Sequence, residues 1–385
     1  MKEVKTIGVI GMGAVGISVS CILQQANIRV LGYQHKSRSK RNFKKLLEEE
    51  KIIVSNKTNV SVLPKKNVLN IEITDSLDDL VSYSDIILRC CSFSEQKSIY
   101  DFTEYQKSIL RERSIPLFLF PGSWVSLGTF SNDELNVGMI GYSPVFATST
   151  LSSDGVFVEI LDFKLNIPLA FYDVETKNDM LIFFNKLFSK NTNTLMFIDG
   201  GSPIKTVLSS PVTAINASAI CDNALKLKAS NGGTIYEEIY MLSDVYTNMF
   251  DKLYKEQVLI GEVMNCGGIF KLRDWFSNRI SSLSKEGDLQ LILSHVYKGK
   301  LVAISGKDRR LFETFYTLLF FKYFSNAIGI DVPATDLAVC EMNSLQKEIN
   351  GSTFPESICN YVKASAISYA NLMNPKIEKM ACSMF

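Results

Sequence analysis

Residues 4–16 read VKTIGVIGMGAVG, an apolar run that leads directly into three closely spaced glycines. The run from Val4 to Ile10 predicts a buried strand, because its Val, Ile and Thr side chains form a continuous apolar stretch. An apolar-periodic helix is predicted after the glycines, to about Gln25. Between strand and helix lies the pattern G-x-G-x-x-G, formed by Gly11, Met12, Gly13, Ala14, Val15 and Gly16. This order is typical of a dinucleotide-binding site.

Each glycine of this loop has a separate physical task in such a site. Gly11 permits the tight turn, Gly13 lets the backbone approach a pyrophosphate, and Gly16 lets helix and strand pack closely. The helix N-terminus then offers N–H groups and the positive end of a dipole to the phosphates. A purely structural turn is the alternative, but the β-α-β pattern that follows favours the nucleotide. We therefore expect all six loop residues to contribute to cofactor binding.

The end of the second predicted strand, Ile28–Gly32, indicates which dinucleotide to expect. NAD sites place an Asp or Glu there to hold the ribose 2′-hydroxyl, but no acidic residue occurs between Asn27 and Leu47. Seven basic residues lie in that segment, and Lys and Arg bind a 2′-phosphate through charge-assisted hydrogen bonds. A solvated basic helix start is the alternative, and His35 either stacks on adenine or lies on the surface. The pattern predicts NADPH, held by Lys36, Ser37, Arg38 and Lys40.

Strands and helices continue to alternate along the first half of the chain. Further strands are predicted at Asn70–Ile73, Asp85–Leu88, Ile115–Phe120, Val137–Tyr142, Val156–Leu161, Ile167–Phe171 and Thr194–Ile198. This alternation predicts an α/β fold with a Rossmann-type doubly wound parallel sheet. Beyond about Ser209 helical periodicity dominates, so an all-helical second domain is expected. We place the boundary near residue 200, with an NADP-binding domain over residues 1–200 and a helical substrate or dimerisation domain over residues 201–385.

Two further loops follow predicted strands at the edge of the sheet where ligands bind. We assign four residues of these loops to the ribose and nicotinamide side of the cofactor, namely Cys91, Ser92, Pro121 and Gly122. Trp124 comes next in the sequence, and it either covers a substrate or closes the loop.

The overall composition describes a globular and nearly neutral protein. Lys and Arg total 41 and Asp and Glu total 40, so the net charge of +1 argues against a nucleic-acid-binding protein. No segment reads as a signal peptide or a membrane span, so we expect a cytoplasmic protein without a membrane partner. No Cys/His spacing indicates a metal site. The last four residues, from Cys382, have the form of a prenylation box, but a frayed tail is the more ordinary interpretation.

With these motifs placed, the chain resembles the opine dehydrogenase family, in particular the opine-metallophore dehydrogenases. The glycine loop with its acid-free second-strand end is the first shared feature. Val156–Tyr172 is similar to the family's strand pair with a central lysine, here Lys164, and Ser210–Asn216 to the segment that opens the helical domain. Phe315–Asp336 follows the family's order of residues. The resemblance implies that NAD(P)H reduces an imine formed between a 2-keto acid and an amine.

The likeness breaks down at the residue that the family uses as catalytic acid and base. The family's histidine precedes the proline that opens the helical domain, and here Ser210 precedes Pro211. A serine hydroxyl cannot replace an imidazole as a general acid near pH 7, because its pKa is far too high. The chain has only two histidines, His35 and His295. The acidic residue that follows the sheet in the metallophore enzymes is also missing, at residues 147–149.

Other polar residues are therefore candidates for the reaction. Lys205 is one candidate proton donor, whereas tyrosines on helices are more often core residues. We assign catalytic roles to Ser210, Asn216 and Tyr240, and substrate contacts to Trp124, Tyr236 and Tyr316.

The sequence thus predicts an NADPH-dependent oxidoreductase of the opine dehydrogenase type, acting on an imine or ketone that bears a carboxylate, in a specialised biosynthetic pathway. We expect a small-molecule substrate bound between the two domains, and a homodimer formed through exposed apolar helix faces. Two alternatives stay open. One is an NADP(H)-binding sensor or partner protein without turnover. The other is a 2-keto-acid reductase of the ketopantoate type, for which Lys205 and Asn216 are a loose match.

Overall fold

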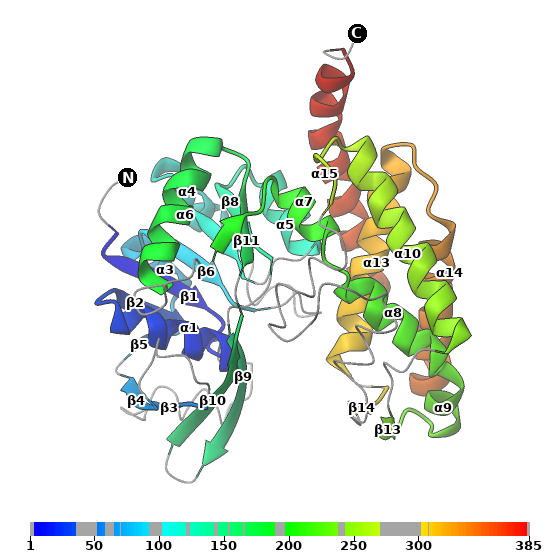
Figure 1. Ribbon diagram of the computed structural model, residues 1–385, viewed down its shortest axis with the longest axis horizontal. Coiled ribbons are helices and arrows are strands. Elements are labelled where there is room, and N and C mark those ends of the chain that lie inside the picture. Colours follow the sequence, from blue (N-terminus) through cyan, green and yellow to red (C-terminus); the bar gives the residue numbers. More distant parts are fainter. Residues whose placement is uncertain are drawn as a thin grey trace. The chain divides into compact units, whose positions relative to one another are not determined.

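The computed structural model describes residues 4–35, 52–57, 65–69, 71–91, 102–120, 124–141, 145–152, 155–164, 166–188, 197–237, 243–269, 302–306 and 308–382 (Figure 1). The chain divides into two compact units. The first, here called the sheet unit, comprises Met1–Gly122 and Asp133–Thr206. The second, the helical unit, comprises Ser123–Asn132 and Val207–Phe385. The short segment 123–132 thus belongs to the helical unit, although the chain on both sides of it belongs to the sheet unit.

A sheet of eight strands forms the centre of the sheet unit. Its order is β12 (Phe197–Asp199), β11 (Ile167–Phe171), β8 (Val137–Ile140), β7 (Leu117–Leu119), β6 (Ile86–Arg89), β1 (Thr6–Ile10), β2 (Arg29–Tyr33) and β5 (Glu72–Thr74). The strands from β8 to β5 run parallel, and β11 pairs with β8 in the antiparallel direction. β1 is buried along its whole length, as expected where both faces of a parallel sheet are covered. The predicted α/β class, with a mainly parallel sheet followed by a helical part, is confirmed.

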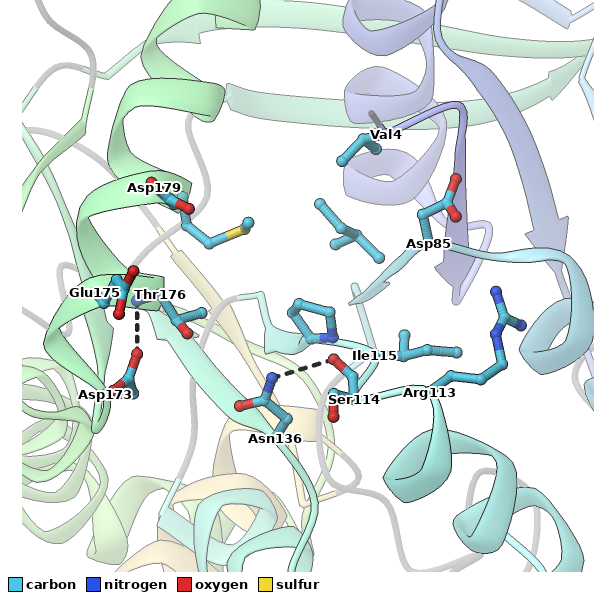
Figure 2. Close-up of a pocket in the computed structure, with 13 residues that line it drawn as sticks. Val4, Asp85, Arg113, Ser114, Ile115, Asn136, Asp173, Glu175, Thr176 and Asp179 are labelled. Carbon is cyan, nitrogen blue, oxygen red and sulfur yellow. Dashed lines mark hydrogen bonds between the residues drawn. The ribbon is translucent and has the colours of Figure 1, made fainter. Parts of the chain in front are cut away.

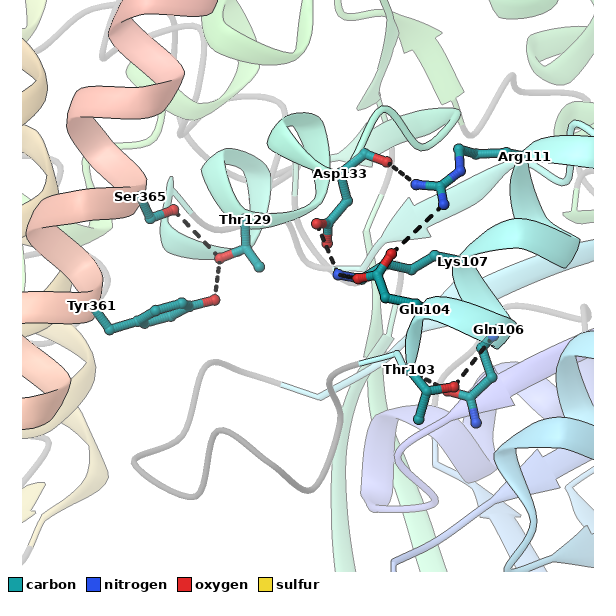
Figure 3. A network of polar contacts seen from close by, with 9 residues as sticks. All are labelled: Thr103, Glu104, Gln106, Lys107, Arg111, Thr129, Asp133, Tyr361 and Ser365. Atoms are coloured by element: carbon teal, nitrogen blue, oxygen red, sulfur yellow. Dashed lines mark hydrogen bonds and ion pairs between the residues drawn. The ribbon is translucent and has the colours of Figure 1, made fainter.

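Helix α4 of the sheet unit begins at a cap that the sequence supplies. α4 starts after Thr103, whose hydroxyl accepts a hydrogen bond from the Gln106 N–H at 3.3 Å, while the Gln106 side chain accepts one from the Thr103 N–H at 2.9 Å (Figure 3). This capping box satisfies two N–H groups that the first turn leaves without acceptors. The Nζ of Lys107 on the same helix lies 2.9 Å from carboxylate oxygens of both Glu104 and Asp133 (Figure 3). The helices are α1 (Ala14–Gln25), α3 (Leu77–Tyr83), α4 (Glu104–Glu112) and α6 (Val174–Phe188).

The sheet unit also contains a second, smaller sheet that the sequence did not predict. Its order is β4 (Lys66–Leu69), β3 (Ile52–Asn56), β10 (Gly155–Phe163) and β9 (Val145–Ser152). β10 pairs antiparallel with β9 and parallel with β3. The segment that resembles the family's strand pair is therefore divided between two sheets, because β10 lies in the smaller sheet and β11 in the central one. Lys164, between these two strands, is half-buried.

The helical unit is built around α13, which packs against α5, α8, α14 and α15. Its described helices are α5 (Trp124–Asn132), α8 (Val212–Asp222), α9 (Ala224–Ala229), α10 (Asp244–Val263), α13 (Arg309–Ala327), α14 (Pro333–Asn350) and α15 (Glu356–Cys382), and α7 (Pro203–Leu208) leads the chain into it. It also contains one antiparallel pair of strands, β13 (Ile235–Glu237) and β14 (Val302–Ile304). None of the helices in the described part of the chain is both long and apolar enough to cross a membrane.

A buried carboxylate of α10 fixes the start of α14. Glu256 is 9% exposed and accepts hydrogen bonds from the N–H of Ala334 at 2.6 Å and from the N–H and hydroxyl of Thr335 at 3.0 and 2.7 Å. Burial raises the pKa of Glu256, and these hydrogen bonds oppose that rise. They satisfy N–H groups at the helix start, which have no acceptor within the helix. Glu256 therefore holds α14 against α10.

Candidate functional site

The glycine loop joins β1 to α1 at the carboxyl edge of the central sheet. Gly11 has a φ of +95°, which strains any residue with a side chain, and its N–H donates to the Tyr33 carbonyl at 3.0 Å. A Cβ on Gly11 would lie 2.9 Å from the Cβ of Cys91. A Cβ on Gly16 would overlap the carbonyl oxygen of Gly11. The path of the backbone itself therefore requires the first and third glycines.

Gly13 differs from its neighbours, because the fold does not need it to be glycine. Its backbone is extended, with φ −87° and ψ −166°, and a Cβ there would meet no atom within 4 Å. Gly13 is the N-cap of α1, so the N–H groups of Ala14 and Val15 have no acceptor within the helix. The first turn of α1 carries no acidic side chain to offset the positive end of the helix dipole. The loop thus offers an open approach and N–H donors, which suit a phosphate group.

Cys91 lies beside this loop, at the end of β6. The N–H of Cys90 donates to the Ile10 carbonyl at 2.8 Å, which extends the pairing of β6 with β1, and Cys91 is 7% exposed. The structure thus brings Cys91 and the glycine loop together. Contact of Cys91 with a cofactor stays a prediction. The other residues predicted for this site lie outside the described residues: Lys36, Ser37, Arg38, Lys40, Ser92, Pro121 and Gly122.

Met12 and Gln34 connect the loop to β2, through contacts that the sequence did not predict. The Met12 N–H donates to Oε1 of Gln34 at 2.9 Å. The Met12 side chain is 3% exposed and lies over β2, where a Cβ on Gly32 would come within 2.8 Å of its Sδ. Gln34 is the first residue after β2 and is 8% exposed. The sequence signal that could have indicated this contact is the neutral amide of Gln34 at the end of the second predicted strand.

The predicted catalytic residues that the structure describes lie at and on α8, in the helical unit. Ser210 is half-buried and directly precedes Pro211, the N-cap of α8, and its N–H donates to the Val207 carbonyl at 3.1 Å. Asn216 is half-buried on the same helix. Lys205 is half-buried on α7, in the part that belongs to the sheet unit. Tyr240 and the side chain of Tyr236 lie outside the described residues.

Trp124 forms part of the aromatic core of the helical unit. It begins α5, is 3% exposed, and its ring centroid lies 5.4–5.8 Å from three ring centroids of α13, those of Phe320, Phe321 and Phe324. It also borders a cavity of about 10 Å³, next to Gln257, whose buried Oε1 has no hydrogen-bond partner. A cavity of that size holds at most one water molecule.

Tyr316, the other described residue predicted to contact substrate, is also in this core. It is 1% exposed, and its ring centroid lies 5.4 Å from that of Phe315 and 5.7 Å from that of Phe354. This environment is the one expected for a tyrosine that packs within a helical core. Its contact with a substrate stays a prediction.

Replacing Trp124 by Ala tests the part that this side chain has in the aromatic core of the helical unit. We expect the variant to lose about 3–5 kcal/mol of unfolding free energy, because its ring fills the space between α5 and α13. Urea denaturation followed by circular dichroism measures this loss. Leu225→Ala on α9 is the control, since Leu225 is 79% exposed and such surface changes stay within about 0.5 kcal/mol. A Trp124→Ala variant as stable as this control contradicts the core role.

A cavity of about 470 Å³ lies at the opposite edge of the central sheet (Figure 2). Three charged side chains that line it already stabilise the fold. Asp85 accepts hydrogen bonds from two N–H groups at the start of β1, and Arg113 donates to three backbone carbonyls at the C-terminal end of α3. Asp173 accepts one from the Thr176 N–H in the first turn of α6, and this bond lowers the pKa of its carboxyl group. None of the predicted site residues that the structure describes lines this cavity.

Several solved oxidoreductase structures share this architecture, although no protein-family model and no curated protein sequence matches the chain. Yersinopine dehydrogenase with bound NADP⁺ aligns with a TM-score of 0.74 over 96% of this chain and 100% of its own, at 10% identity. The chain has the opine dehydrogenase fold. Octopine dehydrogenase, in a structure with NADH and L-arginine, aligns with a TM-score of 0.69 over 95% of each chain, at 13% identity.

The opine dehydrogenase fold confirms the resemblance inferred from the sequence motifs. Both alignments cover nearly the full length of both chains, so the likeness extends beyond the glycine-loop region. At 10–13% identity it establishes the architecture. A more distant likeness is to 2-dehydropantoate 2-reductase from Methylococcus capsulatus, with a TM-score of 0.55 over 89% of this chain and 97% of that one, at 13% identity.

Proposed function

We propose that the protein is an NADPH-dependent oxidoreductase of the opine dehydrogenase type. The observation that carries this proposal is the glycine loop. The backbone requires Gly11 and Gly16, whereas an added Cβ on Gly13 would meet no atom within 4 Å. Gly13 is the N-cap of α1, whose first N–H groups have no acceptor within the helix. A dinucleotide pyrophosphate accounts for that arrangement. The yersinopine and octopine dehydrogenase structures, which share the fold, contain NADP⁺ and NADH respectively.

The residues present fit a nicotinamide dinucleotide. Gly13, Ala14 and Val15 offer their N–H groups to the pyrophosphate, and Cys91 lies against the loop on the side of β6. Lys36, Ser37, Arg38 and Lys40 are proposed to hold the 2′-phosphate. When bound, the nicotinamide supplies a hydride to a carbon of a C=N or C=O bond.

Replacing Arg38 by Ala tests the choice between NADPH and NADH. We expect the Kd for NADPH to rise by about tenfold to hundredfold, because a charge-assisted contact to phosphate contributes about 1.5–3 kcal/mol. The Kd for NADH should change by less than about twofold. Fluorescence titration with each dinucleotide measures both constants. Equal losses for the two cofactors contradict the assignment of Arg38 to the 2′-phosphate.

The proposed substrate is an imine, or a ketone, that carries a carboxylate. A substrate that enters as a preformed iminium already carries its proton, so the protein need only orient it and exclude water. Ser210 and Asn216 can each donate a hydrogen bond to a carboxylate or to the reacting nitrogen. Neither exchanges a proton near pH 7. We therefore propose a substrate that needs little acid catalysis, such as a cyclic imine, in a specialised biosynthetic pathway.

The direct test mixes the purified protein with NADPH and a panel of 2-keto acids, each with and without amino acids, and with preformed cyclic imines. Absorbance at the NADPH band reports oxidation. Oxidation that needs the amine, or that occurs with a preformed imine, supports the proposal. Oxidation by a 2-keto acid alone points instead to the ketopantoate type of reductase, and the distant likeness to 2-dehydropantoate 2-reductase is the observation that keeps this candidate.

A second candidate function is that of an NADP(H)-binding sensor or partner protein without turnover. The observation in its favour is Ser210 at the position where the resemblance implies a catalytic histidine, in a chain with two histidines in total. Tight NADPH binding without oxidation across the whole panel would favour this candidate. In either case we propose a homodimer in the cytoplasm, which size-exclusion chromatography with light scattering and cell fractionation test separately.

A further inference from the structure

Gln34 joins the end of β2 to the glycine loop. Its Oε1 accepts a hydrogen bond of 2.9 Å from the N–H of Met12, 22 residues earlier in the sequence. Gln34 is only 8% exposed, so this bond lies in a buried environment, where leaving the N–H without an acceptor is costly. The Met12 side chain is held in turn over Gly32 of β2. The conformation of the loop and the position of the Gln34 amide therefore depend on each other.

This hydrogen bond also determines which way the amide of Gln34 faces. A backbone N–H can only donate, so the atom next to Met12 must be the amide oxygen. The NH₂ group, which can only donate, then occupies the other side of the amide. The end of the second strand is the place where a glycine-loop site receives the ribose of the adenosine. At that place Gln34 offers an uncharged N–H donor, whereas an Asp or Glu in the same position would offer a negatively charged acceptor.

We propose that Gln34 is a specificity-determining residue that favours a 2′-phosphorylated dinucleotide, with its amide fixed by the Met12 N–H. The inference rests on the proposed function, because it requires that the loop binds a nicotinamide dinucleotide. The amide lets a dianionic 2′-phosphate approach and can donate a hydrogen bond to it. A carboxylate in the same place would repel the phosphate and accept a hydrogen bond from a free 2′-hydroxyl instead.

Gln34→Glu provides a nearly isosteric test. A carboxylate oxygen can still accept the hydrogen bond from Met12, so the loop keeps its anchor. The substitution adds one negative charge and removes the NH₂ donor. We expect the Kd for NADPH to rise by about tenfold to hundredfold through like-charge repulsion, and the Kd for NADH to fall by up to about tenfold. Fluorescence titrations with both dinucleotides, at low and high salt, measure the ratio of the two constants. The rise for NADPH should shrink at high salt.

Gln34→Met is the matched control, because methionine has a similar length but neither charge nor a strong acceptor. It removes both the acceptor of the Met12 N–H and the NH₂ donor but adds no charge. Both dinucleotides should therefore bind more weakly, and their ratio should shift much less than in Gln34→Glu. A ratio that stays constant in Gln34→Glu overturns the inference. So does a ratio that shifts equally in the glutamate and methionine variants, since that result excludes charge as the cause.

The same titrations separate this inference from the proposed function. If the wild-type protein binds neither NADPH nor NADH, the proposed function fails and the inference fails with it. If the wild-type protein binds NADPH but Gln34→Glu leaves the preference unchanged, only the role of Gln34 is refuted. Circular dichroism of each variant should match that of the wild type, which ties any change in the ratio to the site.

Discussion

Gly13→Val should abolish measurable NADPH binding while lowering the unfolding free energy by no more than about 1 kcal/mol, the cost of a poorer N-cap residue. A Cβ at this position meets no protein atom within 4 Å, and the extended backbone of Gly13 suits a β-branched residue. The added methyl groups therefore cost the folded protein little. They occupy the open approach to the first turn of α1, where the pyrophosphate would contact the backbone. Isothermal titration calorimetry with NADPH and a thermal melt of the free protein measure the two effects.

Gly16→Ala is the matched control for this prediction, and it should behave in the opposite way. Its Cβ would overlap the carbonyl oxygen of Gly11, so the loop or the helix must shift. We expect a loss of several kcal/mol of unfolding free energy, and weaker NADPH binding as a consequence of the disturbed loop. Retention of full NADPH affinity by Gly13→Val would contradict a cofactor site at this loop. A Gly13→Val variant as unstable as Gly16→Ala would instead show that Gly13 has a structural task.

Ser210→His should raise the rate of NADPH oxidation with a 2-keto acid by about hundredfold or more, because reduction of a carbonyl needs a proton and a positioned general acid contributes about 10²–10⁴-fold. A preformed iminium, which already carries its proton, should gain little. Ser210 is half-buried and precedes the N-cap of α8, so a larger side chain has access to solvent there. The imidazole would restore the titrating group that the resemblance implies at this position. Steady-state kinetics with the 2-keto acids and with the preformed imines of the panel measure both rates.

The pH profile of this variant provides an independent check. A catalytic imidazole that donates a proton acts in its protonated form, so the added activity should be lost as the pH rises through the histidine pKa, which is ordinarily about 6.5. The wild-type profile should lack this limb. Ser210→Asn serves as a control that is larger than serine but does not titrate. Equal activities of the histidine and asparagine variants at every pH would mean that position 210 is not the family's catalytic position.

The first strand, the glycine loop and α1 could be predicted because their signals are local. A continuous apolar run, three glycines at fixed spacing and a helical period lie within one short stretch of chain. The smaller sheet could not be predicted in this way. Its strands come from segments that are far apart, and the parallel pairing of Ile52 in β3 with Val156 in β10 leaves no local signal.

Helix α5 shows a second limit of prediction from sequence, because its glycine and serine residues favour a loop when they are considered without the rest of the chain. The segment after Pro121 contains glycine and serine residues, which are typical of a loop, and Trp124 was assigned to that loop. The structure shows a helix in which Gly128 lies against the ring of Phe320, where a Cβ would be only 2.5 Å from ring atoms. The glycine serves close packing between helices, and this requirement depends on a residue far along the chain.

In the candidate site too, features with a local sequence signal could be predicted and contacts between distant segments could not. The tight turn at Gly11 and the close packing at Gly16 could be predicted, because the spacing of the glycines encodes them. The approach of a pyrophosphate to Gly13 stays a prediction. The hydrogen bond between Met12 and Gln34 could not be predicted, since it depends on how β2 returns beside β1 and on which side chain reaches the loop. The sequence indicated that an acidic residue was missing there, but only the structure identified the side chain that takes part in the loop.

The place of α5 in the helical unit has a consequence for cotranslational folding. The strands before and after it in the sequence, β7 and β8, pair directly with each other. The central sheet can therefore form before the later helices of the helical unit have been synthesised. The partners of α5, Phe320 and Phe324 on α13, leave the ribosome much later. Until α13 has been synthesised, the apolar side chains of α5 around Trp124 lack their native packing partners. We therefore expect the nascent chain to bind chaperones that recognise exposed apolar segments.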